Sequence, residues 1–160
     1  MQNPDLTINI PGATFMCRAA ALIIRDGKLL AVNNKVYPNL YYTVGGRVNL
    51  HETTQEAVVR EVYEEIGVVL EVDKPVFINE RFLRVDGITA HELVFYYTMK
   101  SKPDLDIANG VFTDQGELET LHWLPLADLD NYNLVPPWLK TGLGRLDDIN
   151  SVEHIISKEY

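Results

Sequence analysis

Residues 53–67 carry helix signals at both ends, in a chain whose other segments resemble strands. Thr53 followed by Glu56 matches a capping box, in which the threonine hydroxyl caps the helix and the glutamate reaches back to a backbone amide. Gly67 fits the position just past the end, where a left-handed residue is needed. We therefore predict a helix over residues 54–66. One well-defined helix among many strands indicates an α+β domain.

This predicted helix has an apolar face and an acidic face. At roughly 100° per residue, the first face collects Val58, Val59, Val62, Tyr63 and Ile66, which we expect to point into the core. Glu61, Glu64 and Glu65 fall on the other side, where Ala57 leaves room for an approaching group. Arg60 lies at the edge, one turn from Glu56 or Glu64, and can hold a carboxylate in position.

The clustered carboxylates require an explanation, because like charges at helical spacing repel by about 0.2–0.5 kcal/mol per pair. An acidic run is most often a solvated face. A hard divalent cation such as Mg²⁺ or Mn²⁺ would remove the repulsion, and such ions prefer carboxylate oxygens. Gly45 and Gly46 precede the helix, where backbone can pass close to a ligand. Together these features favour a cation site.

The remaining segments predict strands joined by turns. Asp26-Gly27 and Asp86-Gly87 are hairpin signals. We expect strands over residues 68–72 and 75–85, a long loop over residues 104–119, and a second helix in "PPWLKTGLGRL". We see no linker, so we expect residues 1–160 to form one domain, with helices covering a mixed sheet.

Charge and composition exclude several classes of protein. The 160 residues carry a formal net charge of −9, which argues against general nucleic-acid binding. No apolar stretch approaches the length of a membrane span, so we expect no membrane partner. Cys17 is the one cysteine, which suits a reducing compartment. No signal peptide is visible, and we expect a cytoplasmic protein.

The segment from Gly46 to Val68 resembles the signature of the Nudix hydrolases. That signature is Gly, five residues, Glu, seven residues, Arg-Glu, an aliphatic residue, any residue, Glu-Glu, any residue, Gly and an aliphatic residue. Every specified position matches: Gly46, Glu52, Arg60, Glu61, Val62, Glu64, Glu65, Gly67 and Val68. Many members have Pro and Gly where this chain has Val44 and His51. A pattern with so many fixed positions is highly specific.

The resemblance implies an α/β/α sandwich with a mixed sheet, and a pyrophosphatase that needs Mg²⁺ or Mn²⁺. It implies a small nucleotide substrate, either a nucleoside triphosphate or a diphosphate conjugate such as ADP-ribose or a nucleotide sugar. Water would attack one phosphorus of the pyrophosphate. Carried over by position, Glu61, Glu64, Glu65 and the Gly46 carbonyl would bind the metal. Arg60 would orient the glutamates.

Other roles implied by the resemblance are less specific. Glu52 would support the loop before the helix or contact the metal through water. The base differs among members: it can be a glutamate of the signature, such as Glu61, or one from a later loop. The best loop candidate here is Glu117 in "TDQGELE", for which an exposed loop acid is an equal interpretation.

Residues outside the signature suggest further substrate contacts. Arg18, Arg81 and Arg84 lie on predicted strands and could reach a phosphate or a base, although pairing with surface acids is the usual role. We expect about one aromatic residue at the ligand, from the candidates Tyr37, Tyr41, Phe82, Tyr132 and Trp138. His91 could be a ligand, or simply form a hydrogen bond at the start of its strand.

Two alternatives remain at this stage. One is a nucleotide-sensing domain with the same fold and no turnover, against which the complete set of signature residues argues. The other is hydrolysis at RNA ends, which the acidic balance disfavours. A homodimer is common in the family and is a starting assumption here. The sequence leaves open the substrate, the scissile bond, the base, the number of metal ions and the oligomeric state.

Overall fold

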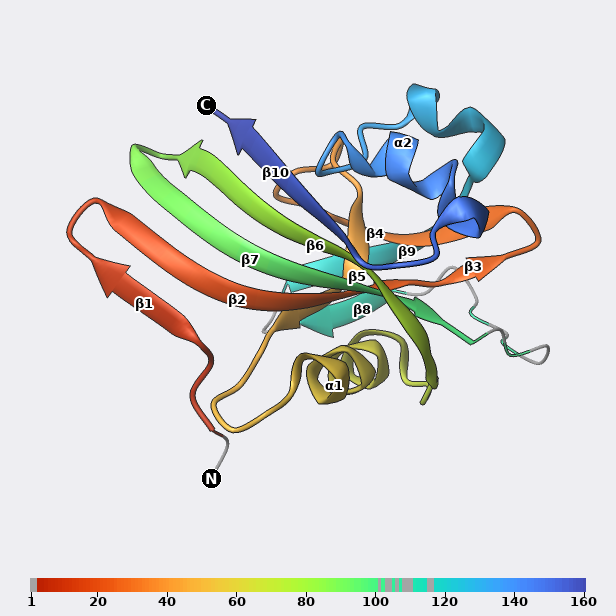
Figure 1. The fold of residues 1–160 in the computed structure, drawn as a ribbon, viewed down its shortest axis with the longest axis horizontal. Coiled ribbons are helices and arrows are strands. Elements are labelled where there is room, and N and C mark those ends of the chain that lie inside the picture. Colours follow the sequence, from red (N-terminus) through yellow and green to blue (C-terminus); the bar gives the residue numbers. More distant parts are fainter. Residues whose placement is uncertain (1–2, 101, 103–104, 106, 108–110, 115–116) are drawn as a thin grey trace.

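The computed structural model describes residues 3–100, 102, 105, 107, 111–114 and 117–160. A mixed β-sheet forms the middle layer, with α1 (Thr54–Ile66) on one face and α2 (Leu139–Leu143) on the other (Figure 1). The strands are β1 (Thr7–Ile10), β2 (Ala13–Leu22), β3 (Ile24–Arg25), β4 (Lys28–Asn34), β5 (Tyr42–Arg47), β6 (Val72–Val85), β7 (Ile88–Met99), β8 (Val111–Asp114), β9 (Glu117–Pro125) and β10 (Glu153–Glu159). Two short 3₁₀ helices complete the α2 layer, η1 (Leu126–Asn131) and η2 (Leu146–Asp148).

The sheet has the strand order β10-β6-β7-β2-β5-β4-β9-β8, with β1 added to β2 and β3 to β4. The β2–β7 and β10–β6 pairs are parallel and the others are antiparallel. β5 changes partner along its length. Residues 42–43 pair with β4, whereas residues 44–47 pair with β2. This strand therefore connects the two halves of the sheet.

Helix α1 spans the predicted residues 54–66. The Thr53 hydroxyl accepts a hydrogen bond from the Glu56 amide at 3.1 Å, and the Glu56 carboxylate accepts one from the Thr53 amide at 2.9 Å. Gly67 ends the helix with φ 71°, and its amide donates to the Tyr63 carbonyl at 2.9 Å. No basic residue lies in the last turn. Local capping thus sets both ends.

The core lies on both faces of the sheet, and β2 shows why. Alternating side chains of this strand point to opposite faces. Ala19 and Ala21 pack with α1, whereas Ala20 and Leu22 pack on the side of α2. Val58, Val62 and Ile66 of α1 are buried, as predicted. Full burial of such side chains stabilises the fold by about 1.5–3 kcal/mol each.

Two residues of α1 lie differently from our expectation. Ala57 is buried in the core and does not line the acidic face, whereas Tyr63 is exposed. The buried arc of the helix is therefore rotated toward Ala57, and the room beside the carboxylates comes from elsewhere. None of the helices among the described residues is long and apolar enough to cross a membrane.

The strands joined by the two Asp-Gly turns were predicted correctly, whereas β8 and β10 were not predicted as strands. The Asp26-Gly27 turn joins β3 to β4 and the Asp86-Gly87 turn joins β6 to β7, as expected. The long loop predicted over residues 104–119 is wrong where β8 and the start of β9 form a hairpin. The strand predicted at residues 68–72 is absent except for Val72, which is the first residue of β6. β10 was not predicted, and the second helix has only five residues.

Candidate active site

A cavity of about 650 Å³ is lined mainly by residues of the C-terminal half of α1, of β5 and of the segments beside them, with Arg18 of β2. It brings together seven residues that the sequence singled out: Arg18, Gly45, Gly46, Arg60, Glu61, Glu64 and Glu65. Helix α1 supplies Arg60 and the acids, β5 supplies the glycines and β2 supplies Arg18. Residues separated by up to 47 positions in the chain therefore share one polar cavity.

The Glu61 carboxylate packs directly on the backbone of β5. A Cβ atom added at Gly46 would lie 2.5 Å from the Glu61 carboxyl carbon, so a side chain at this position would displace the carboxylate. The Glu61 side chain is only 13% exposed. Burial raises the pKa of Glu61, and the hydrogen bond from Arg60 opposes that rise. The bare Gly46 Cα supplies the space that the sequence analysis attributed to Ala57.

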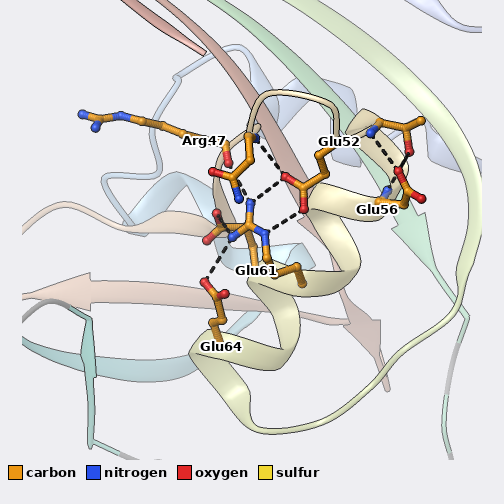
Figure 2. Close-up of polar contacts among 8 residues, drawn as sticks. Arg47, Glu52, Glu56, Glu61 and Glu64 are labelled. Carbon is orange, nitrogen blue, oxygen red and sulfur yellow. Dashed lines mark hydrogen bonds and ion pairs between the residues drawn. The ribbon is translucent and has the colours of Figure 1, made fainter. Parts of the chain in front are cut away.

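Arg60 gathers three glutamates around its guanidinium group. Its Nη1 donates to Glu61 at 2.7 Å and to Glu64 at 3.1 Å, and its Nε donates to Glu52 at 2.8 Å. Figure 2 shows Glu52, Glu61 and Glu64 turned toward this common centre. Glu56, which the helical spacing also made a candidate partner, instead caps the helix through Thr53. Arg60 therefore fixes the positions of two carboxylates at the cavity.

Glu52 anchors Arg60 from the loop before α1. Its carboxylate accepts two hydrogen bonds from Arg60, at 2.8 and 2.9 Å, and a third from the Asn49 amide at 2.9 Å. The hydrogen bond from Arg60 is the largest cause of the lowered pKa of Glu52. Arg60 also donates to the Arg47 carbonyl at 2.9 Å. These contacts tie the loop, the helix and the end of β5 together.

Gly45 brings β5 close to its neighbour. With φ 144°, it adopts a conformation that favours glycine, and a Cβ there would collide with the Ala19 carbonyl oxygen of β2. The Gly45 amide donates to the Glu65 carboxylate at 3.0 Å. The two consecutive glycines thus have separate roles. Gly45 allows close approach of the strands, and Gly46 makes room for Glu61.

The residues at this cavity fit a divalent cation by their chemistry. Three carboxylates and a backbone carbonyl are hard oxygen donors of the kind that Mg²⁺ and Mn²⁺ prefer. Arg60 engages one oxygen each of Glu61 and Glu64. Over the described residues, no group of three His, Cys, Asp or Glu side chains already forms a metal-holding arrangement. A cation at this cavity would compete with Arg60 for the carboxylates of Glu61 and Glu64.

Two of the predicted substrate residues lie away from this cavity. Arg81 forms a bidentate pair with Glu159 at 2.7 Å and donates to Glu92 at 3.2 Å. The Phe82 ring stacks on His91, with centroids 4.4 Å apart. His91 also lies 3.2 Å from the Glu80 carboxylate. Glu117 begins β9, and its side chain lies outside the described part of the structure.

Of the other aromatic candidates, Trp138, Tyr41 and Tyr132 also pack elsewhere, and Tyr37 is exposed. Trp138 donates a hydrogen bond to Asn79, and Tyr41 makes edge contacts with Tyr132 and His122. Tyr42 lines the cavity instead, together with Asn34 and Arg47. Sequence reasoning missed these three residues. The signal available for Tyr42 was its place three residues before Gly45, at the start of the strand that leads into the glycines.

Comparisons with known proteins identify the type of domain that most of the chain forms. Residues 16–142 match the model of the NUDIX domain. A MutT-like protein of Streptomyces ambofaciens is 33% identical over 106 residues, which cover 66% of this chain. The match spans 60% of that relative's own length.

Solved structures share the fold. A NUDIX hydrolase from Nitrosomonas europaea superposes with a TM-score of 0.59 and 20% identity, covering 85% of this chain and 96% of that one. An ADP-ribose pyrophosphatase from Streptococcus suis gives a TM-score of 0.55 and 18% identity, covering 87% and 98%. The family match extends well beyond the 23-residue signature and takes in both faces of the sheet. This chain therefore belongs to the Nudix hydrolase family.

Proposed function

We propose that this protein hydrolyses a nucleoside diphosphate linked to another group and requires Mg²⁺ or Mn²⁺. The expected substrates are nucleoside triphosphates or conjugates of the ADP-ribose and nucleotide-sugar type. The observation that carries the proposal is the Glu61 carboxylate packed on the bare Cα of Gly46, in a cavity that Glu64 and Glu65 also line. The MutT-like relative and the similarity in fold to an ADP-ribose pyrophosphatase support a pyrophosphate target.

In this proposal Glu61, Glu64, Glu65 and the Gly46 carbonyl hold the cation. When bound, the cation would neutralise phosphate charge, polarise the phosphorus and lower the pKa of the attacking water. Arg60 keeps Glu61 and Glu64 aimed at the cavity, and Glu52 holds Arg60 in place.

Removal of the water proton needs a carboxylate within hydrogen-bond reach. Glu61 is the candidate in the cavity wall and Glu117 is the candidate from β9. Glu61→Gln and Glu117→Gln test them separately, because loss of the base lowers kcat more than it lowers cation affinity. The base is the residue whose loss lowers kcat at saturating Mg²⁺ without a matching loss of Mg²⁺ affinity.

A phosphate-release screen tests the activity itself. Wild type, Glu64→Gln and Glu65→Gln are compared over nucleoside triphosphates, ADP-ribose, nucleotide sugars and a 5′-triphosphorylated RNA, with and without Mg²⁺. Glu71→Gln is the matched control, because Glu71 is exposed and pairs with Lys100 away from the cavity. Loss of activity in the first two variants alone supports the proposal. Equal rates in all four proteins defeat it, and tight binding without turnover supports nucleotide sensing.

We also propose that residues 1–160 form one Nudix domain. The family match ends at residue 142, but the chain continues into β10, which pairs in parallel with β6 over Glu153–Glu159. The C-terminal segment is thus part of the same sheet. Limited proteolysis tests this: a stable fragment lacking residues 143–160 would contradict it.

A further inference from the structure

A row of alternating charges crosses four neighbouring strands and ends at the cavity. Its members are Glu159 on β10, Arg81 on β6, Glu92 on β7 and Arg18 on β2. Arg81 and Glu92 are register partners, and the two outer residues are diagonal neighbours on the same face. The sheet therefore lines up these side chains in strand order, from its β10 edge to the cavity.

Glu92 is the buried centre of this row. The residue is only 5% exposed, and burying a carboxylate without partners is costly. One carboxylate oxygen lies 3.2 Å from Arg81, and the other lies 3.6 Å from Arg18. Each oxygen thus faces a different arginine. Because Arg81 is also bound to Glu159 through two hydrogen bonds, the four charges balance only when Arg18 is counted.

Arg18 is the end of the row that faces the cavity. Its side chain is 37% exposed, and it lines the cavity together with Glu61. The other cavity arginines are more tightly held. Arg60 binds three glutamates, and Arg47 donates to Asp5 at 2.9 Å. At 3.6 Å the Arg18–Glu92 contact is an ion pair without a short hydrogen bond, so Arg18 retains donors for an anion.

We propose that Glu92 is a positioning residue that presents Arg18 to a phosphate group of the substrate. The inference rests on the proposed function, since the phosphate belongs to the same nucleotide. A guanidinium group matches phosphate oxygens with a rigid fork of donors. Glu92 holds Arg18 where it lines the cavity and neutralises it before the substrate binds. Arg81 and Glu159 keep the Glu92 carboxylate in place from the other side.

A double-mutant cycle with Glu92→Gln and Arg18→Ala tests this role. Loss of one charge-assisted contact to phosphate is expected to raise KM about 10-fold in Arg18→Ala, with a smaller change in kcat. Glu92→Gln should raise KM in the same direction. In the Arg18→Ala background, Glu92→Gln should add less than about 2-fold, because residues that act through one another are not additive.

A binding measurement accompanies the kinetics. Titration calorimetry with inorganic pyrophosphate and Mg²⁺ measures the affinity of the same four proteins, and it should show the same non-additive loss. Glu80→Gln is the control, because Glu80 lies on β6 beside Arg81 but contacts His91 and His154 instead. Its KM and pyrophosphate affinity should equal those of wild type. Glu92→Asp keeps the buried charge, withdraws the carboxylate from Arg18 and should also raise KM.

Two results would overturn the inference. One is unchanged KM and pyrophosphate affinity in Glu92→Gln and Glu92→Asp. The other is a Glu92→Gln effect of equal size in both backgrounds, which is expected of a purely structural role. If wild type hydrolyses no nucleotide in the screen, the proposed function fails instead, and the pyrophosphate titration still decides the role of Glu92. Thermal unfolding confirms that each variant is folded.

Discussion

Two clusters of arginine and glutamate differ in charge balance: one lies at the cavity, and the other reaches the cavity through Arg18. Around Arg60, one arginine contacts three glutamates, so negative charge is in excess. Along the sheet, two arginines and two glutamates alternate and the charges cancel. The same residue types therefore suit different partners. The acidic excess attracts a cation, whereas the balanced row presents its terminal arginine to an anion.

The largest effect should come from the cluster with excess charge. Glu61→Gln keeps the shape of the side chain and removes its charge, so kcat should fall by about 10²–10⁴-fold, the range of a general acid or base. Steady-state kinetics at saturating Mg²⁺ measure this, with Glu71→Gln as the control. A fall in kcat of less than about 3-fold would show that Glu61 takes no part in the reaction. The two clusters would then no longer differ in function in the way described above.

Gly46→Ala tests whether the position of Glu61 matters as well as its charge. The new methyl group would occupy the space of the carboxylate. We expect destabilisation by about 1–3 kcal/mol from overpacking, and weaker Mg²⁺ binding.

Gly144→Ala is the matched control for this variant, because a Cβ there meets no described atom closer than 3.6 Å. Urea unfolding and Mg²⁺ titration compare the two variants. Equal behaviour of both would contradict the role of the bare Cα at position 46.

A smaller effect should appear in the pH dependence of stability. Arg60 lowers the pKa of Glu52 below its ordinary value of 4.5. Glu52 therefore stabilises the fold above pH 4.5, and this contribution is lost as the pH falls through the lowered pKa. Glu52→Gln should cost about 1.5–3 kcal/mol at pH 7, the typical value for hydrogen bonds to a charged group. Urea unfolding in the presence of a chelator measures the free energy of unfolding of wild type and Glu52→Gln from pH 7 down to pH 3. The two curves of free energy against pH should converge at low pH. Parallel curves would contradict the assignment.

The smallest effect should come from the far end of the balanced row. Glu159→Gln removes the bidentate partner of Arg81, but Glu92 keeps both of its arginines. KM should therefore rise by less than about 3-fold, well below the change in Glu92→Gln. Kinetics of the two variants measured side by side check this order. A larger effect of Glu159→Gln than of Glu92→Gln would contradict the assignment of Glu92 as the residue that positions Arg18.

Local signals predicted the helix and its acids well, because caps act within a few residues. Thr53, Glu56 and Gly67 placed both ends of α1 correctly. The partners of Arg60 were harder to predict. Helical spacing could not show that the Glu56 carboxylate already accepts a hydrogen bond from Thr53. It also could not show that the loop before the helix brings Glu52 into contact with Arg60.

Long-range pairing was the main source of missed features. β10 was not predicted because Glu153–Glu159 pairs with residues 77–83, more than 70 positions away. The row through Glu92 depends on that pairing and on the parallel contact between β2 and β7. The alternation in "HELVFYY" is enough to put Glu92 and Val94 on one face, but it gives no sign of which strands lie on either side.

Helix α1 ends without a basic residue in its last turn, although Glu64 and Glu65 lie there. Backbone dipoles make that end of the helix electronegative, so acidic side chains in the last turn are unfavourable by about 0.3–1 kcal/mol each. A bound cation would relieve this strain as well as the repulsion among side chains. Divalent ions should therefore raise the melting temperature even without a nucleotide, and this stabilisation should weaken as monovalent salt screens the field of the helix.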